Sequence, residues 1–386
     1  MELRKLIAFN FWLLSVLIAF IAGYQFNNLR TQHPQALQLV DRAYAILEEN
    51  AIDPLPQDNR LAYGALEGMF QAYQQTQNDP FTAFIKPVEH ELQTNTLSGR
   101  FGGIGARLER DSENNLLLYP LPDGPAQRAG IQAADQLRYI DSLEVTPETP
   151  MDDILAAVRG PVGQPVTLQI WRPTAQTNLT FTIERAEFSL PSVTWNIDSD
   201  EPRLGIIQIH TIAETTPAEI QTAITNLQQQ GAQAFILDLR NNGGGLLNAG
   251  IDTAKLFLPE GIVIQQQFRG KNVESFKVTR PGAFANLPLA ILVNGNTASA
   301  AELIAGSLQY HHRAILIGQP TYGKGSIQLV FELGDGSSLH VTAARWWVPT
   351  RQPLTPGNGL QPDVLIDPQT TEPKAEIRAA LPYLLP

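Results

Sequence analysis

The stretch Asn296-Thr297-Ala298-Ser299-Ala300-Ala301-Glu302 indicates the fold of the second half of this 386-residue chain. An apolar run over residues 287–293 precedes it and predicts a buried strand, and a helical pattern follows from Ala300 to Leu308. Ser299 is therefore expected at a strand-to-helix turn. Backbone N–H groups at the start of a helix have no helical acceptor, so they can stabilise an oxyanion there.

A second stretch, Tyr322-Gly323-Lys324-Gly325-Ser326-Ile327-Gln328, follows downstream. A serine needs a base to become a nucleophile, and a lysine that is shielded from water can be that base. A free lysine titrates near 10.4, so a base useful around pH 8 needs a downshift of roughly two to three units, which burial can supply. Taken singly, Ser299 is more simply a helix N-cap and Lys324 a solvated cation.

Together the two stretches resemble the catalytic elements of the carboxyl-terminal processing peptidases, which are serine–lysine proteases with a PDZ domain. The patterns of that family read roughly S-A-S-A-S-E and G-x-x-T-[FY]-G-K-G-S-x-Q. The resemblance implies that Ser299 is the nucleophile, Lys324 its base and Gln328 the residue that orients the lysine. Two flanking serines of the first pattern are replaced here by Thr297 and Ala301, so that pattern is not intact.

The composition limits the classes of function. Lys and Arg number 27 against 38 Asp and Glu, and the formal net charge of −11 argues against a nucleic-acid partner, because phosphate binding needs clustered cations. The chain has no cysteine, which excludes disulfides and thiolate catalysis. Its six histidines show no ligand spacing. We therefore expect neither a metal site nor a cofactor.

Residues 1–30 predict a signal-anchor or transmembrane segment. Cations precede a nearly uninterrupted apolar run from Leu6 to Gly23, which approaches the length that spans a bilayer. By the positive-inside rule the rest of the chain lies outside the cytoplasm. A large residue stands at the −3 position of a cut after Ala22 or Gly23, so we expect an uncleaved anchor. The expected location is membrane-anchored, on the periplasmic or cell-surface side of a bacterial-type cell.

Residues 31–96 predict an N-terminal helical region. Two apolar stripes recur at helical spacing and are expected to be core faces: Leu37, Val40, Ala43, Tyr44 and Leu47, then Leu61, Ala65, Leu66, Met69 and Phe70. Asp79-Pro80-Phe81-Thr82 breaks the pattern. The resemblance implies that this is the family's N-terminal region, which carries a similar D-P-[HY]-[ST] turn and can serve in dimer contacts, as in a homo-oligomer.

Residues 97–186 show short strands and two short helices in an order that looks like a PDZ domain of bacterial protease type. The glycine-rich segment Gly102 to Gly105 opens it. By resemblance, Gly103, Ile104 and Gly105 would bind the peptide, offering backbone N–H groups to a terminal carboxylate. The strand edge from Ile104 would add the peptide as an extra strand.

Residues 187–386 alternate strands and helices and predict an α/β catalytic domain with a C-terminal extension. The loop Asp238-Leu239-Arg240-Asn241-Asn242-Gly243-Gly244-Gly245 lacks the lysine and the spacing of phosphate-binding loops. It resembles the family's D-L-R-x-N-P-G-G, with Asn242 in place of proline, a change that would loosen the turn. The resemblance implies that Gly243 or Gly244 supplies one oxyanion N–H and Ala300 the other. Asp238 and Arg240 are expected to brace the loop.

The sequence thus predicts a multidomain α/β protein, with an N-terminal helical region, an α+β PDZ domain and an α/β protease core of ClpP/crotonase-like type. The expected function is an extracytoplasmic serine endopeptidase that captures protein or peptide substrates by accessible C-terminal tails and cleaves through an acyl-enzyme. One alternative is a catalytically weak PDZ peptide-binding scaffold on the protease fold. Others are a hydrolase of small esters and a Ser–His–Asp mechanism that uses His340.

Overall fold

The computed structural model describes residues 35–56, 58–349, 353–370, 372 and 374–385. The chain divides into two compact units, residues 1–73 and residues 74–386. The membrane segment predicted at residues 1–30 lies outside the described residues. Within the described ranges, no helix combines the length and the apolar character that a bilayer span requires.

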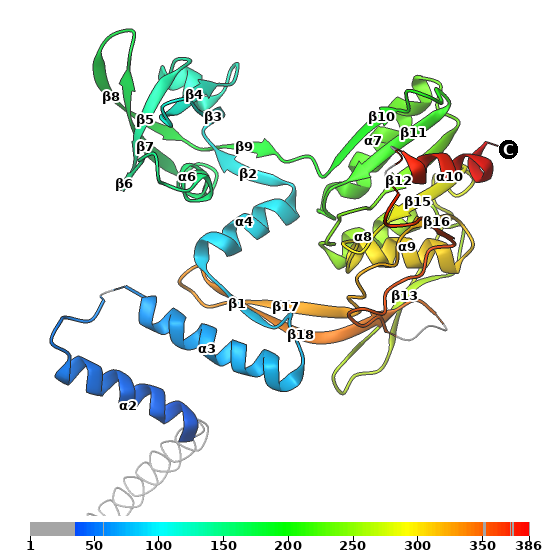
Figure 1. The fold of residues 1–386 in the computed structure, drawn as a ribbon, viewed down its shortest axis with the longest axis horizontal. Coiled ribbons are helices and arrows are strands. Elements are labelled where there is room, and N and C mark those ends of the chain that lie inside the picture. The colour runs from blue at the N-terminus through cyan, green and yellow to red at the C-terminus, as the bar shows by residue number, and fades with distance from the viewer. Residues whose placement is uncertain (1–34, 57, 350–352, 371, 373, 386) are drawn as a thin grey trace, which may run out of the picture. The chain divides into compact units, whose positions relative to one another are not determined.

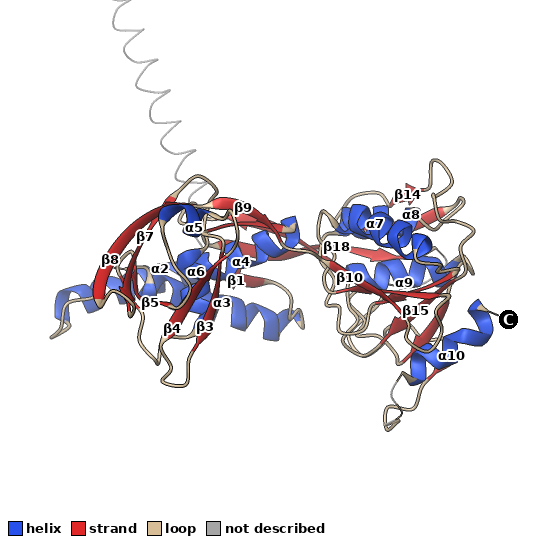
Figure 2. Cartoon of the chain, turned by 90° about the horizontal axis from the view of Figure 1, so that it is seen from above, coloured by secondary structure: helices blue, strands red, loops and turns tan. Residues whose placement is uncertain are grey.

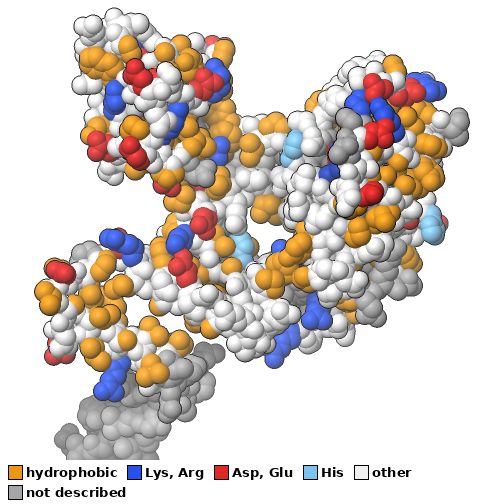
Figure 3. Space-filling view, viewed as in Figure 1, with side chains coloured by type: hydrophobic (Ala, Val, Ile, Leu, Met, Phe, Trp, Pro, Cys, Tyr) orange, Lys and Arg blue, Asp and Glu red, His pale blue; other side chains and the backbone are white. Residues whose placement is uncertain are grey.

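The first unit contains helix α2 (Gln35–Asn50) and most of helix α3 (Arg60–Gln77). Both helices were predicted, but their apolar stripes are not core faces in the described chain. Leu37, Val40 and Leu47 of α2 are 40%, 48% and 48% exposed, and α3 has no buried residue. Figure 3 shows apolar side chains on the surface of these helices.

The region that resembles a PDZ domain is a single antiparallel sheet with two short helices. Its strand order is β3-β4-β5-β7-β8, with β6 paired to β5, so β3 lies at one edge. Leu118, Leu137, Ile154 and Leu168 are at most 2% exposed and form its core. The elements are β3 (Ala106–Arg110), β4 (Leu116–Pro120), α5 (Pro125–Ala129), β5 (Asp135–Ile140), β6 (Leu143–Glu144), α6 (Met151–Val158), β7 (Pro165–Arg172) and β8 (Thr177–Glu184).

The chain enters and leaves this region through two strands that pair with each other. β2 (Arg100–Gly103) is antiparallel to β9 (Ala186–Ser189), with Arg100 opposite Ser189 and Gly103 opposite Ala186. Helix α4 (Pro87–Ser98) directly precedes β2 and ends at Gly99, whose positive φ of 70° suits a residue without a side chain.

Residues 187–386 are built on a six-stranded sheet of order β10-β11-β12-β15-β16-β19. All neighbours from β11 to β19 are parallel, and β10 is antiparallel at the edge. The strands are β10 (Val193–Ile197), β11 (Leu204–Ile209), β12 (Ala234–Asp238), β15 (Leu289–Val293), β16 (Ile315–Gly318) and β19 (Val364–Leu365). β12 and β15 are buried on both faces: β15 is a continuous apolar run and β12 is apolar up to Asp238 at its end, as is typical of parallel strands under helices.

Helices cover both faces of this sheet. Phe235 and Leu237 of β12 face one core, with α7 (Thr216–Gln229), α8 (Leu247–Lys255) and α9 (Ala300–Tyr310). Ala234 and Ile236, which alternate with them, face the second core with α10 (Ala375–Leu384). Figure 2 shows α10 on the side of the sheet opposite α7 and α9.

A second sheet brings distant segments together. It contains β1 (Ala83–Ile85), β13 (Ile262–Phe268), β14 (Glu274–Lys277), β17 (Ser326–Glu332) and β18 (Ser338–Trp347). The long strand β18 pairs with β17 along one edge and with β1 and β13 along the other. Ala83 of β1 lies opposite His340, so the start of the second unit pairs with β18, whose other neighbour, β17, carries Gln328 (Figure 1).

Arg185 holds the end of α6 in place. The residue is only 9% exposed, and its guanidinium donates to the carbonyls of Ala157 (2.9 Å), Val158 (3.0 Å) and Pro165 (3.1 Å). We expect Arg185→Met to destabilise this sheet by about 2–4 kcal/mol, because three buried acceptors lose a charged donor. Hydrogen-exchange mass spectrometry should show faster exchange in α6 and β7. Arg138→Met, at an exposed position, is the matched control, and equal exchange in the two variants would contradict the role of Arg185.

Candidate active site

Ser299 lies at the predicted turn, between β15 and α9. It is the N-cap residue of α9, and its backbone has φ 54° and ψ −121°. A positive φ is strained for a residue with a side chain and is found at sites where the surroundings enforce it. Gly244 lies against this turn, because a methyl group at Gly244 would approach the Ser299 Cβ to 2.7 Å. Position 244 therefore requires glycine.

One buried carboxylate joins this turn to the segment that carries Lys324. Glu302 is fully buried in the first turn of α9. Its Oε2 accepts the backbone N–H groups of Ser299 (2.9 Å) and Lys324 (2.8 Å). Its Oε1 accepts the N–H of Gly323 at 2.7 Å and the hydroxyl of Thr321. Burial raises the pKa of the Glu302 carboxyl, and these hydrogen bonds oppose the rise.

Lys324 is largely buried, and no carboxylate lies close enough to form an ion pair with it in the described chain. Burial lowers the pKa of its amino group, while the negative charges of Asp79 and Glu302 act in the opposite direction. The Nζ lies 4.5 Å from the centre of the Phe81 ring. Within the described residues it has no ion pair inside 4.0 Å. The buried environment thus makes the Lys324 amine lose its proton more readily than a free lysine does, and the neutral amine is the form that can accept a proton.

Gln328 lies on β17, four residues after Lys324. Its Nε2 donates to the hydroxyls of Ser326 (3.0 Å) and Thr342 (3.2 Å). The hydrogen bond to the lysine that the resemblance implies is not among the contacts of Gln328 in the described chain. The amide oxygen is the end of this side chain that is not committed to Ser326 and Thr342.

The glycine loop is fixed by Asn242 rather than loosened by it. Asn242 is fully buried, its Nδ2 donates to the carbonyl of Ile209 (2.7 Å), and its Oδ1 accepts the N–H of Gly244 (2.8 Å). The Gly244 N–H is therefore already engaged. The N–H groups of Gly243 and Ala300 donate to no other residue in the described chain, so these two remain available to an oxyanion.

Asp238 and Arg240 brace the loop, as expected. The Arg240 guanidinium binds the Asp238 carboxylate through two hydrogen bonds of 2.9 and 2.6 Å. Its Nη1 also lies 3.3 Å from the Glu376 carboxylate on α10. Neither side chain lines the cavity that contains Ser299.

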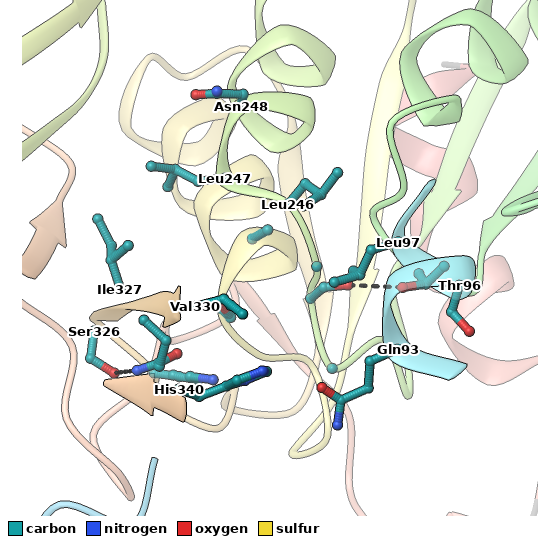
Figure 4. Close-up of a pocket in the computed structure, with 18 of the residues that line it drawn as sticks. Gln93, Thr96, Leu97, Leu246, Leu247, Asn248, Ser326, Ile327, Val330 and His340 are labelled. Atoms are coloured by element: carbon teal, nitrogen blue, oxygen red, sulfur yellow. Dashed lines mark hydrogen bonds between the residues drawn. The ribbon is translucent and has the colours of Figure 1, made fainter. Parts of the chain in front are cut away.

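The six predicted catalytic and oxyanion residues come together around one cavity of about 790 Å³. Figure 4 shows its walls: Leu97 on α4, Leu246 and Leu247 before and on α8, and Ile327 and Val330 on β17. These walls are mainly apolar, and Ser299, Lys324 and Gln328 are polar residues that line the same cavity. Apolar walls with a few polar groups are typical of a binding cavity.

His340 also lines this cavity, yet its surroundings do not form a Ser–His–Asp arrangement. Its Nε2 has no hydrogen-bond partner among the described residues, and its ring packs edge-on against the ring of His90 at 6.3 Å. Burial lowers the pKa of His340, and the nearby His90 and Lys324 lower it further. No carboxylate orients the ring in the described chain, and a Ser–His–Asp arrangement needs one.

The predicted peptide-binding residues lie elsewhere. Gly103 is the last residue of β2, Ile104 is 1% exposed in the PDZ-like core, and Gly105 has a φ of 68°. The carbonyls of Ile104 and Gly105 accept Ala126 N–H (2.8 Å) and Leu121 N–H (2.9 Å). The Ile104 side chain therefore belongs to the core, and only backbone from this segment and the edge strand β3 can meet a peptide.

Two contributors to the site were not assigned roles from the sequence. Glu302 stands three residues after the N-cap Ser299, which is the spacing of a capping box and was the available signal. Asp79 was seen only as part of a turn. Its influence on Lys324 depends on a strand pairing between segments far apart in the chain, and no local pattern carries that information.

We expect Glu302→Gln to destabilise the second unit by roughly 2–6 kcal/mol. An amide keeps only one acceptor oxygen, so two of the four buried donors lose their acceptor at about 1–3 kcal/mol each. Chemical denaturation followed by tryptophan fluorescence measures the change. Glu260→Gln, at an exposed position, is the control. Equal stability of the two variants would show that the carboxylate does not hold the segments together.

Comparison with known proteins matches two regions of the chain to known families. A sequence profile of peptidase family S41 matches residues 203–366, and a PDZ-domain profile matches residues 118–172. The carboxyl-terminal-processing protease of Synechocystis sp. is 34% identical, over 86% of this chain and 80% of its own length. The protein of the same name from Picosynechococcus sp. is 35% identical, over 75% of this chain and 70% of its own.

Among solved structures, a photosystem II D1 C-terminal processing protease is 27% identical and covers 88% of this chain and 90% of its own. Its TM-score is 0.47. The two sequence relatives match this chain over most of its length and most of their own. The chain therefore belongs to peptidase family S41, the carboxyl-terminal-processing proteases, and is a serine-type peptidase.

Proposed function

We propose that this peptidase cleaves proteins near accessible C-terminal tails, with Ser299 as nucleophile and Lys324 as general base. One observation carries the proposal: the two residues line the same cavity, and their backbone N–H groups bind the same Glu302 oxygen. Because one buried carboxylate holds the backbone of both residues, little conformational freedom remains to be lost when the nucleophile and the base meet the substrate. No cofactor is required for this chemistry.

The reaction follows from the roles of these groups. The Ser299 Oγ forms a bond to the scissile carbonyl carbon while its proton passes to the neutral Lys324 Nζ. The C–N bond then breaks, and the lysine ammonium gives the proton to the leaving amine. Water attacks the resulting ester with Lys324 again as base, which releases the new carboxylate and restores Ser299.

The negative charge that develops on the carbonyl oxygen needs donors. We assign this role to the N–H groups of Gly243 and Ala300, because the Gly244 N–H is bound to Asn242. Gly244 instead allows the loop to approach the nucleophile closely. Two backbone donors at a helix start are a recurrent means of stabilising such an oxyanion.

Gln328 is assigned the role of orienting the lysine. It lines the cavity with Lys324, and its Nε2 is held by two hydroxyls. An amide oxygen fixed in this way can accept a proton of the lysine amine. This would direct the lone pair of the amine toward Ser299.

The PDZ domain is assigned the capture of the substrate tail. β3 lies at the edge of its sheet, where an extended peptide can add as a further strand. Backbone N–H groups of Gly103, Ile104 and Gly105 would then bind the terminal carboxylate. The apolar walls of the catalytic cavity are consistent with an unfolded substrate.

We further propose that the peptidase works outside the cytoplasm of a bacterial-type cell, anchored through residues 1–30. The support is the run of apolar residues preceded by cations. The exposed apolar stripes of α2 and α3 are consistent with assembly into a homo-oligomer.

The dyad is tested with an unfolded protein that ends in an apolar tail. We expect Ser299→Ala and Lys324→Ala to lower kcat/KM by at least about a thousandfold, because the nucleophile and its base act as a unit. Mass spectrometry identifies the cleavage sites. Lys255→Ala on α8 is the matched lysine control and should retain full activity. Cleavage that survives Lys324→Ala would rule out the lysine base and return attention to His340.

The lowered pKa of Lys324 also has a consequence for stability. The pKa of Lys324 is lower in the folded state than in the unfolded state, so the charged amine reduces the stability of the fold at low and neutral pH. This cost declines as the pH rises through the folded pKa and vanishes above the ordinary value of 10.5. Lys324→Met should therefore stabilise the protein most at neutral and lower pH, and the gain should disappear at high pH. Denaturation curves at a series of pH values measure it, with Lys255→Met as control. A gain that grows with pH would contradict the assignment.

A further inference from the structure

The Asp79 turn is far from the dyad in sequence and close to it in space. Asp79 comes just before β1, which pairs with β18. Its Oδ1 accepts the hydroxyl of Thr342 on β18 (3.0 Å) and the N–H of Phe81 (3.1 Å), and its Oδ2 accepts the hydroxyl of Thr82 (2.6 Å). Burial opposes the charge of Asp79, but these hydrogen bonds prevail and lower its pKa. The group is therefore a carboxylate near neutral pH.

A carboxylate at this place determines the direction of the hydrogen bonds that lead to Gln328. Ionised Asp79 can only accept, so the proton of the Thr342 hydroxyl must point to it. The Thr342 oxygen is then an acceptor for its other neighbour, and the end of Gln328 that faces it must be the NH₂ group, at 3.2 Å. The amide oxygen of Gln328 is turned away from Thr342 as a result.

The same turn also acts on Lys324. Phe81, whose N–H is bound by Asp79, places its ring 4.5 Å from the lysine Nζ. The negative charge of Asp79 stabilises the charged form of the lysine. The titratable groups that act on Lys324 from the surrounding elements are Asp79 before β1, Glu302 on α9 and His340 on β18, with His90 of α4 beside His340.

We propose that Asp79 is a positioning residue for the lysine base. Through Thr342 it sets which end of the Gln328 amide is presented to Lys324, through Phe81 it covers the amine, and its charge tunes the amine's affinity for a proton. The inference rests on the proposed roles of Lys324 and Gln328. It adds that the Asp79 turn, which lies outside the two stretches that carry Ser299 and Lys324, helps to position the catalytic groups.

The test is the pH dependence of kcat/KM for the full-length chain in detergent, with a fluorogenic peptide that has an apolar free C-terminus. Asp79→Asn removes the charge that favours the ammonium, so the lysine should lose its proton more readily. The acidic limb of the profile, in which kcat/KM rises as the lysine loses its proton, should then move to lower pH by roughly half a unit or more. At the plateau kcat should fall about tenfold to a hundredfold, because the amide and the amine are less well oriented.

Two further variants separate charge from position. Asp79→Glu keeps the charge, so its acidic limb should stay with that of the parent while kcat falls. Thr342→Val breaks the link to Gln328 and leaves the charge of Asp79, so it should likewise lower kcat without moving the limb. Asp252→Asn, an exposed aspartate on α8, is the matched control and should leave the profile unchanged.

The outcomes are distinguishable. If Lys324→Ala abolishes cleavage while Asp79→Asn leaves both kcat and the limb unchanged, the role of Asp79 is refuted and the dyad stands. The role of Asp79 is also refuted if Asp79→Asn moves the acidic limb to higher pH, or if Asp79→Glu moves the limb as far as Asp79→Asn does. If Lys324→Ala retains full activity, the proposed function fails and the inference fails with it.

Discussion

The buried carboxylate of Glu302 is the interaction on which the site depends. A charged group can stay in an apolar interior only if donors replace the water it has lost, and here four donors do so. Three of them come from the segment 321–324 and one from Ser299. Because Ser299 and Glu302 belong to the same helix turn, local helix geometry fixes their separation. Any segment bound to Glu302 is thereby placed relative to Ser299.

The parallel sheet supplies the second half of this arrangement. The loops that follow the neighbouring strands β12 and β15 both lie at the carboxyl ends of those strands, where α/β proteins commonly form their sites. They are bonded to each other: the Ala298 N–H donates to the Asn242 carbonyl (2.9 Å), and the Thr297 hydroxyl donates to the Leu239 carbonyl (2.8 Å). Thr297, one of the departures from the family pattern, therefore has a structural task that a hydroxyl performs.

Sequence patterns predicted the parts of this molecule that depend on neighbours in the chain. The strand before Ser299, the helix from Ala300 and the family were confirmed, because apolar periodicity and short motifs are local. The contact between Thr342 and Asp79 spans 263 residues and depends on strand pairing, which periodicity cannot specify. Asn242 was misjudged for a related reason, since its partner Ile209 comes from another strand. The apolar stripes at residues 37–47 and 61–70 predicted helices α2 and α3 correctly, but an apolar stripe in a sequence does not reveal whether another element packs against it.

The environment of Asn242 also bears on the chemical lifetime of the enzyme. Asn242 is followed by Gly243, and an Asn-Gly pair in a flexible chain readily loses its side-chain amide when the next backbone nitrogen attacks the carboxamide carbon. Here both ends of that carboxamide are held, by Ile209 and by Gly244, in a fully buried position. The side chain cannot swing toward the Gly243 nitrogen while the loop is folded. Resistance of this loop to spontaneous deamidation is therefore a property of the native state, and each unfolding event exposes it to irreversible damage.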